Sequence, residues 1–392
     1  MKDRPVLTPY DEFPVHQAPV PFSQVPSTDL GWDDGYFFCA FNAALKVILF
    51  TGMRVSPNSD MIGGYAGISI EGRQYTVRFS REWRPDFATR IGPLSYAFTR
   101  PLREIALRLD ASDFDLSFDL VWEAVAEAWV EAHHVAHNRQ RRTTDQTRYT
   151  QTGTVSGHIL FRGRRFDLAR GHWTGTRDHS WGLYAGRAPL VPDPRWLPPP
   201  AAPARRRALR FWMPFRTADY TGFYHFHEDE DGSQAALDDV FGTPFEGVVD
   251  HGFDGPRVRL VSAVHALEFV PGTRSIARGV IDLVDESGRN WRHEIETAFP
   301  PWTPATIGYA AGSWRDGGTM FAYHGPGVVM ECDEFDLSRQ PCEHRNHLGQ
   351  PMLPWGVEHI VRLRSTGPGG VAEGEGYLEF FLDGRYTPYG FE

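Results

Sequence analysis

Apolar and polar residues alternate with a period of two over much of the chain. The clearest case is the run Leu-Ser-Phe-Asp-Leu-Val-Trp-Glu at residues 116–123. Because successive side chains of a β-strand point to opposite faces, this pattern is typical of strands with one buried face. Turn residues predict hairpins over residues 67–79, 155–166 and 278–295, turning at Glu71-Gly72, Arg162-Gly163 and Glu286-Ser287-Gly288. Further strands are expected at residues 258–270, 320–330 and 376–382.

One stretch has a spacing that also fits a helix. Trp122, Val125, Trp129 and Val130 fall near positions i, i+3, i+7 and i+8 of the segment 122–137, in which Ala is frequent. We predict a short helix here, after the strand. The alternative is that the strand continues as far as Val130.

A proline-rich segment divides the chain. Residues 188–204 read Ala-Pro-Leu-Val-Pro-Asp-Pro-Arg-Trp-Leu-Pro-Pro-Pro-Ala-Ala-Pro-Ala, a composition typical of stiff, extended linkers. We therefore predict two consecutive β-domains, residues 1–187 and 205–392, each of ordinary domain size. No short repeat of fixed period is present, which argues against a solenoid or a propeller. Closed or nearly closed barrels would leave few edge strands exposed.

The composition agrees with a β-rich globular protein. Of the 392 residues, 14% are aromatic, and 39 Gly and 30 Pro favour turns. The 40 basic and 50 acidic residues give a net charge of -10, which argues against nucleic-acid binding. The 3 Cys cannot form a disulfide framework, so a reducing, cytoplasmic location is expected. The longest apolar run, residues 37–50, is too short to span a bilayer, and we expect neither a membrane span nor an export signal.

The densest group of polar side chains is an octet bounded by two glycines, Gly175-Thr176-Arg177-Asp178-His179-Ser180-Trp181-Gly182. On a strand, its even-numbered polar residues point to one face and its odd-numbered ones to the other. If the face of Asp178 lines a barrel lumen, burial raises the pKa of this carboxyl, and the protonated acid can donate to an alkene or a carbonyl. Arg177 and His179 would then face the opposite domain. In the alternative interpretation the octet is a strand-end corner, where Asp178 accepts a salt bridge and Trp181 belongs to the core.

The octet and other segments resemble a bacterial family of uncharacterised proteins that carry an Arg-Asp-His-Ser-Trp-Gly signature. The other segments are Arg148-Tyr149-Thr150-Gln151, Gly153-Thr154-Val155-Ser156-Gly157, the aromatic stretch 211–232 and Gly376-Tyr377-Leu378-Glu379-Phe380. This family is similar to a branch of the lipocalin-like two-barrel superfamily, which includes carotenoid 1,2-hydratases, tocopherol cyclases and fungal Diels–Alderases. The resemblance implies an all-β fold of two consecutive antiparallel lipocalin-like domains, each a β-barrel or a β-sandwich.

The resemblance also implies a role for Asp178. The hydratases have Asp-His-Asn where residues 178–180 of this chain read Asp-His-Ser, and the Asp is their proton donor. Two positions depart from their pattern: Thr176 replaces a Tyr, and residues 149–151, Tyr-Thr-Gln, replace a His-x-Trp pair. Since the replaced residues support cation chemistry, carotenoid hydration itself is not expected. Proton-initiated chemistry on another terpenoid or on a polyketide remains the expectation.

Other His, Cys and acidic residues give weaker signals. His133 and His137 would share one face of a helix, but neighbouring arginines favour a solvated basic loop. His225 and His227 share a strand face before an acidic turn and would point into a second cavity, although a solvated hairpin turn is favoured. A further group has zinc-like residue types in a spacing that matches no common site: Cys332, Cys342, His344 and His347. We therefore predict no metal ion and no cofactor, and no nucleotide-binding or hydrolase motif is present.

The expected function is that of a cofactor-independent lyase or isomerase, hydratase- or cyclase-like, with a hydrophobic terpenoid, steroid-like or polyketide substrate. Asp178 is the expected acid, and Arg177 or His179 sets its protonation and position. The residues expected to contact substrate or water are Tyr149, Gln151, Thr176, Ser180 and Trp181. The alternative is a binding protein that holds a hydrophobic small molecule unchanged. An Asp178 carboxylate in a closed lumen favours catalysis, and one tied to an Arg at a domain contact favours a structural role; the oligomeric state stays open.

Overall fold

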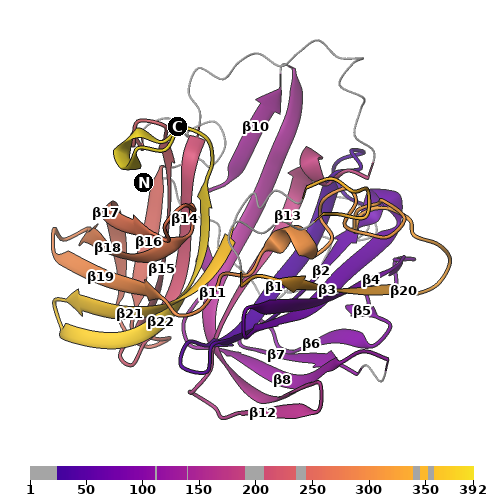
Figure 1. Cartoon of the computed structure of the whole chain (residues 1–392), viewed down its shortest axis with the longest axis horizontal. Helices are drawn as coiled ribbons and strands as arrows, with labels where there is room; N and C mark the ends of the chain where they lie inside the picture. Colours follow the sequence, from indigo (N-terminus) through magenta and orange to yellow (C-terminus); the bar gives the residue numbers. More distant parts are fainter. Residues whose placement is uncertain are drawn as a thin grey trace.

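The structure, a computed structural model, describes residues 24–110, 113–138, 140–189, 207–234, 244–338, 345–351 and 357–392. Nearly all of its regular structure is β, arranged as a curled open sheet and a closed barrel (Figure 1). The predicted all-β class is confirmed. No helix in the described ranges is long and apolar enough to cross a membrane.

The open sheet is built mainly from the first half of the chain. Its strands are β1 Trp32–Asn42, β2 Val47–Ser56, β3 Met61–Ile70, β4 Arg73–Glu82, β5 Arg90–Ile91, β6 Leu94–Arg100, β7 Glu104–Leu109, β8 Leu116–Ala124, β9 Trp129–Val130, β10 His134–Asn138, β11 Arg141–Phe161, β12 Arg164–Leu168, β13 Thr174–Tyr184 and β20 Val329–Asp336. They follow the order β20-β4-β3-β2-β1-β13-β11-β8-β7-β6-β5, and β9, β10 and β12 also pair with β11. The octet therefore lies on β13, a central strand flanked by β1 and β11.

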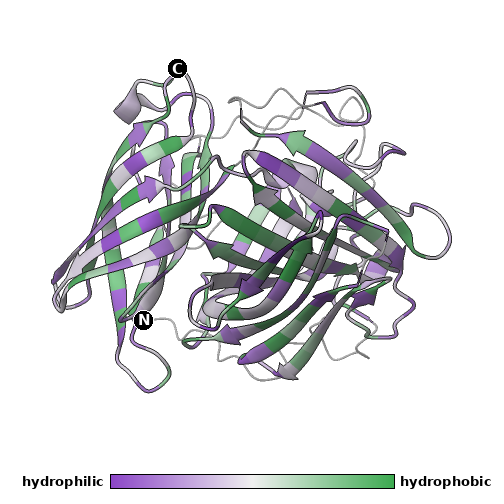
Figure 2. Cartoon of the chain, turned by 60° about the horizontal axis from the view of Figure 1, so that its bottom comes forward, coloured by the Kyte–Doolittle hydropathy of each residue, from purple (hydrophilic) through white to green (hydrophobic). Residues whose placement is uncertain are grey.

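The barrel is built from the second half of the chain. Its strands are β14 Arg207–Thr217, β15 Thr221–Asp229, β16 Phe245–Asp250, β17 Arg257–Phe269, β18 Ile276–Asp285, β19 Asn290–Thr297, β21 Val357–Gly367 and β22 Gly370–Leu382. Successive strands pair antiparallel and β22 closes on β14, which is the up-and-down arrangement of lipocalins. Hydrophilic and hydrophobic residues alternate along these strands (Figure 2). Short 3-10 helices in the described chain are η2 Pro57–Ser59, η3 Ala185–Arg187, η5 Pro304–Thr306 and η6 Thr387–Tyr389.

The predicted hairpins are present with their predicted turns. Glu71 and Gly72 join β3 to β4 with φ values of 55° and 74°, and Arg162 and Gly163 join β11 to β12 with 51° and 78°. Two positive φ values in a two-residue loop are typical of the turn whose twist matches that of antiparallel strands. The third hairpin, β18–β19, turns at residues 286–288 as expected, with Gly288 at a φ of 77°.

Two predicted elements are wrong. The segment 122–137 contains no helix, because β11 is 21 residues long and offers hydrogen-bonding partners to β9 and β10 beyond the end of β8. The strand predicted over residues 320–330 begins only at Val329, since Gly325 and Gly327 take φ values of 127° and 76° that break the extended backbone.

After strand β19 of the barrel, the chain returns to the open sheet for one strand. Strand β20, from residues 329–336, pairs with β4 at the edge of the open sheet (Figure 1). The open sheet thus includes a strand from beyond the segment 188–204. That predicted linker lies outside the described residues from position 190 onward. The division into residues 1–187 and 205–392 stays a prediction.

Three hydrophobic clusters hold the molecule together. One fills the concave side of the open sheet around Phe38 and Trp122, and one fills the barrel around Phe211 and Phe226. The third joins the two sheets around Trp302, which is 1% exposed. The third cluster makes the contact between the sheets a packed interface. Each large apolar side chain buried there stabilises the fold by about 1.5–3 kcal/mol.

Candidate functional site

A cavity of about 510 Å³ lies where the open sheet meets the outside of the barrel. Strands β1, β2, β3, β11 and β13 line it on one side, and β14, β21 and β22 line it on the other. The loop over residues 302–310 adds a third wall. A cavity of this size has room for one small organic molecule.

Aromatic rings form much of the cavity wall. Trp302 stacks on Phe50 with 4.1 Å between ring centroids, and its ring lies 6.5 Å from that of Phe37. Phe37 in turn lies 5.5 Å from Tyr377, and Tyr309 closes the wall from the loop side. Flat apolar faces of this kind suit a hydrophobic ligand, and their π-electrons also attract positive charge.

Asp178 lies in this cavity and is mostly buried. Its β13 neighbours are Phe37 on β1 and Thr150 on β11. Its Oδ2 lies 4.0 Å from Nε of Arg148, whose Nε–H has no hydrogen-bond partner among the described residues. The carboxylate therefore sits beside an Arg at the contact between two sheets rather than in a closed barrel lumen.

Glu358 on β21 is a second carboxyl of the cavity, and sequence reasoning missed it. It is 4% exposed, and its Oε2 has no hydrogen-bond partner among the described residues. Burial, reinforced by the negative charge of Glu379, raises the pKa of Glu358 well above its ordinary value, although a hydrogen bond with Tyr377 opposes this. Burial and the nearby Glu358 also raise the pKa of the Tyr377 phenol. Burial therefore favours the protonated form of the Glu358 carboxyl, the form predicted for Asp178.

A signal for Glu358 exists in the sequence. The segment 357–361 reads Val-Glu-His-Ile-Val, in which a single acid stands among apolar residues of a strand. A carboxyl in such a position either points to solvent or is buried at a cost. Only the packing of the barrel against the open sheet decides between these, and that packing joins segments far apart in sequence.

Arginines of β14 line the barrel side of the cavity. Arg210 on β14 forms an ion pair with Glu379 on β22, and its second terminal nitrogen has no hydrogen-bond partner among the described residues. Burial, assisted by the positive charge of Arg210, lowers the pKa of Arg207 to about 10. The Arg207 guanidinium therefore stays charged at neutral pH, and the cavity offers cationic N–H donors beside its aromatic wall.

Comparisons with known proteins identify the family of this chain. Its sequence matches the profile of the Family of unknown function (DUF8625) over residues 7–392. The chain belongs to this family. No protein with a curated description matches it.

Solved structures give distant similarities to this DUF8625 protein. The crystal structure of kievitone hydratase from Nectria haematococca matches with a TM-score of 0.44 and 8% sequence identity, over 91% of this chain and 90% of that chain. The crystal structure of the outer membrane protease OmpT from Escherichia coli matches with a TM-score of 0.10 and 9% identity, over 90% of this chain and 94% of that one.

Arg177 lies on the opposite face of β13 from Asp178. The prediction that it faces the other domain is wrong, because this face packs onto the core of the open sheet. The guanidinium carbon lies 5.0 Å from the ring centroid of Trp122 and 5.1 Å from that of Tyr149. Its Nε and a terminal nitrogen donate to Oε1 of Gln151 at 3.0 and 2.6 Å.

His179 lies in the same core, so the prediction that it faces the other domain is also wrong. Its Nε2 lies 2.7 Å from Oδ1 of Asp34, and its Nδ1 lies 3.1 Å from the Tyr149 hydroxyl. The imidazole ring also packs against Tyr36 with 4.3 Å between centroids. Trp181 also packs against His179, with 5.1 Å between ring centroids. These contacts hold β13 to its neighbours.

Thr176 and Ser180 share the face of Asp178, whereas Tyr149, Gln151 and Trp181 lie on the face of Arg177 and His179. The Ser180 hydroxyl accepts from a terminal nitrogen of Arg54 at 3.0 Å, and Arg54 pairs with the buried Asp33. The Thr176 hydroxyl lies 3.4 Å from the Gln151 carbonyl oxygen. Of the eight predicted site residues, only Asp178 belongs to the described lining of the cavity. The roles predicted for the other seven stay predictions.

The His and Cys residues considered as metal ligands lie in different surroundings. His133 is exposed, and its ring nitrogens lie 2.6 Å from Asp145 and 3.0 Å from Thr147. His347 lies 3.2 Å from Asp333, whereas Cys342 and His344 fall outside the described residues. His225 and His227 are buried on β15, and both lie on the outer face of the barrel toward the open sheet. His225 meets two buried glutamates there.

Proposed function

We propose that this protein is a cofactor-independent lyase or isomerase, hydratase- or cyclase-like, that acts on a hydrophobic substrate in the cavity between the sheets. The observation that carries this proposal is the buried Glu358 carboxyl, whose pKa is raised by burial, beside an aromatic wall and a second carboxyl, Asp178. A buried carboxyl with a raised pKa beside a second carboxyl is typical of sites for acid–base catalysis. Terpenoid, steroid-like and polyketide molecules are the substrate classes that fit an apolar cavity of this size.

Glu358 donates its proton to an alkene or a carbonyl of the substrate in the proposed reaction. The positive charge that develops on the substrate is stabilised by the faces of Phe37 and Trp302 and by the Asp178 carboxylate. In a hydration, water adds to the cationic carbon and gives a proton to Asp178. In an isomerisation or cyclisation, Asp178 takes a proton from the substrate instead. In each case the proton returns from Asp178 to Glu358 through solvent, so the enzyme is regenerated.

The cationic side of the cavity orients the substrate in this proposal. Arg148 and Arg210 each have an N–H group without a hydrogen-bond partner in the described chain. A buried donor without an acceptor is unfavourable by about 1–3 kcal/mol, so an oxygen function of the substrate is favoured at this end. The proposed substrate therefore has an apolar body and an oxygen-bearing end.

A second candidate function is binding without chemistry. It is favoured by the position of Asp178, whose carboxylate lies 4.0 Å from Arg148 at the contact between the sheets. That is the arrangement expected of a structural ion pair. In this alternative the cavity holds a hydrophobic small molecule, and Glu358 serves only as a hydrogen-bond donor to it.

Incubation with a lipid extract in oxygen-18 water separates the two functions. The purified protein, Glu358→Gln and Asp178→Asn are compared by mass spectrometry of the solution and of the captured compound. Glu375→Gln is the matched control, because Glu375 is a partly buried acid of β22 whose pKa is also raised and which does not line the cavity. We expect a product with the wild type and the control and none with the other two. Capture of an unchanged compound by all four proteins would contradict catalysis and favour binding.

A further inference from the structure

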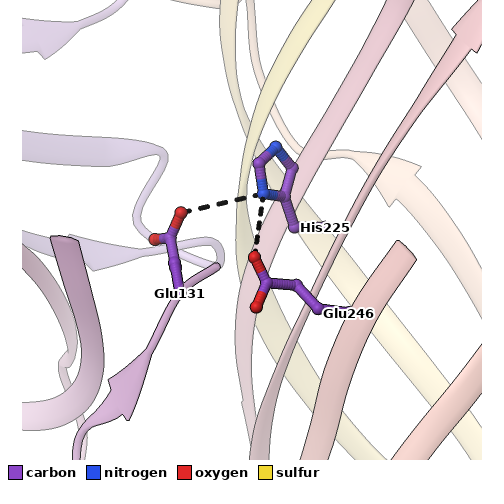
Figure 3. Close-up of side chains that lie close together, drawn as sticks. All are labelled: Glu131, His225 and Glu246. Atoms are coloured by element: carbon purple, nitrogen blue, oxygen red, sulfur yellow. Dashed lines mark ion pairs between the residues drawn. The ribbon is translucent and has the colours of Figure 1, made fainter. Parts of the chain in front are cut away.

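Three buried side chains meet where the barrel touches the open sheet. Glu131 follows β9 of the open sheet, whereas His225 lies on β15 and Glu246 on β16 of the barrel (Figure 3). Their exposed fractions are 3%, 3% and 4%. Figure 3 shows both carboxyl groups directed at the same ring nitrogen of His225. The two sheets thus contribute to one small polar cluster.

The distances from His225 to the two carboxylates are longer than those of hydrogen bonds. Nδ1 of His225 lies 3.7 Å from Oε2 of Glu131 and 3.7 Å from Oε1 of Glu246. Both separations exceed the 2.7–3.2 Å of ordinary N–H···O hydrogen bonds. Two ligands held about 2.1 Å from one ion, at tetrahedral to trigonal angles, lie roughly 3.4–3.6 Å apart. The three donor atoms all lie within 4.8 Å of one another, which fits a shared ion.

The surrounding hydrogen bonds hold the carboxyls in this orientation. The Trp212 indole and the Thr150 hydroxyl both donate to Oε1 of Glu131, so its Oε2 is left facing His225 without a hydrogen-bond partner in the described chain. The Trp129 indole donates to Oε2 of Glu246 at 3.0 Å. Outer donors of this kind are typical of the groups that orient metal-binding carboxylates.

We propose that Glu131, His225 and Glu246 bind a divalent transition-metal ion that joins the open sheet to the barrel. One imidazole nitrogen and two carboxylate oxygens are ligands that zinc, manganese and iron(II) share. The ion offsets the repulsion between two buried carboxylates. The cluster lies behind Trp212, which lines the cavity and donates to Glu131, so the ion stabilises the interface and takes no part in the proton transfer.

Arg210 on β14 contacts the cluster directly. Its Nε lies 3.3 Å from Nε2 of His225, so this nitrogen accepts the hydrogen bond and the ring proton sits on Nδ1. An ion on Nδ1 moves the ring proton to Nε2, where it opposes the Arg210 N–H. Removal of this donor in Arg210→Met should therefore strengthen metal binding.

Calorimetric titration of chelator-treated protein with zinc tests the proposal. We expect one zinc ion per chain in the wild type and in Glu375→Gln, at least about tenfold weaker binding in Glu131→Gln and His225→Gln, and tighter binding in Arg210→Met. The Glu375 variant is the control because it changes a carboxyl of the same interface that hydrogen-bonds Ala43 instead. Absence of zinc binding in the wild type, or equal binding in the ligand variants, would overturn the proposal. Weaker or unchanged binding in Arg210→Met would contradict Nδ1 as the donor.

A measurement on the wild type covers the case in which the variants fail to fold. Manganese broadens nearby NMR signals, and the indole N–H groups of Trp129 and Trp212 contact the two proposed carboxylate ligands. The indole of Trp122, in the core of the open sheet, is the internal control. We expect substoichiometric manganese to broaden the first two signals and leave the third sharp. Equal broadening of all three, or none, would overturn the proposal.

Discussion

The inside of the barrel and the junction between the sheets are both packed with aromatic side chains, but the junction retains a large cavity. In the barrel, Phe211 stacks on Phe226 and Tyr224 with 4.9 and 5.7 Å between ring centroids, and all three are fully buried. At the junction, Trp302 packs as tightly on Phe50, yet a cavity of about 510 Å³ remains beside it.

The difference follows from closure. An eight-stranded barrel has an interior just wide enough for its own side chains, and large aromatic residues fill it. The outside of a closed barrel curves away from any second sheet, so contact there is incomplete. Polar groups line the gap from both sides: Asp178 and Arg148 lie on the open sheet, and Glu358 and Arg210 lie on the barrel. In this protein the cavity lies outside the barrel.

The largest contrast should come from removing one ring in each region. Phe211→Ala should lower the free energy of unfolding by about 4 kcal/mol, because the closed barrel cannot collapse onto the hole. Tyr309→Ala, at the cavity wall, should lower it by about 1 kcal/mol, since this ring is only partly buried. Urea unfolding of both variants measures the difference. Equal losses would contradict the contrast between a filled barrel and an unfilled junction.

Charged groups should show the opposite contrast. Asp33 is 1% exposed and pairs with Arg54 and Arg187 beside the cavity, so Asp33→Asn should lower the free energy of unfolding by about 3 kcal/mol. Asp282 pairs with Arg292 on the outside of the barrel, where both side chains are about half exposed. Asp282→Asn should therefore lower it by less than about 1 kcal/mol. Thermal and urea unfolding of the two variants would reveal a reversed order if this account is wrong.

Glu358 should make the stability of the protein fall as the pH rises. The pKa of this carboxyl is raised on folding, above an unfolded value of about 4.3. Above that pH the unfolded chain loses the proton while the folded chain keeps it, so the free energy of unfolding falls by up to about 1.4 kcal/mol per pH unit until the folded pKa is reached. The glutamine in Glu358→Gln cannot titrate, so the free energy of unfolding of this variant should rise relative to that of the wild type as the pH rises. Urea unfolding at several pH values checks this, and parallel curves would contradict it.

The smallest effects should be equal in the two regions. Gly163 in the open sheet and Gly288 in the barrel occupy hairpin turns with φ values of 78° and 77°, and an added Cβ would meet open space at both. Gly163→Ala and Gly288→Ala should each lower the free energy of unfolding by about 1 kcal/mol, from backbone strain alone. Similar losses would show that the larger contrasts come from packing and charge. A loss at one site several times that at the other would weaken this interpretation.

Local signals in the sequence predicted the local structure well. The turn pairs Glu71-Gly72 and Arg162-Gly163 fixed two hairpins, because positive φ values are set by the residues at the turn itself. The octet was expected on a strand, and it lies on β13. The helix predicted over residues 122–137 failed because the partner that favours strands there, β11, is a tertiary feature.

The candidate site depended on contacts that no local pattern contains. Alternation along β13 separated Asp178 from Arg177 and His179, but it could not tell which face met the barrel and which met the core of the open sheet. Glu358 joins Asp178 only because β21 and β13 belong to sheets that pack together. Likewise Glu131 and Glu246 are 115 positions apart in the sequence and meet His225 only at the junction.

The protonation state of Glu358 is measured most directly by carbon-13 NMR of protein labelled at the glutamate carboxyl carbons. The signal that disappears in Glu358→Gln identifies this residue, and its shift is followed from low to high pH. We predict that it keeps the position of a protonated acid through neutral pH, while exposed glutamates titrate near about 4.3. A Glu358 signal that titrates with the exposed glutamates would contradict the proposed role of this residue as the proton donor of the cavity.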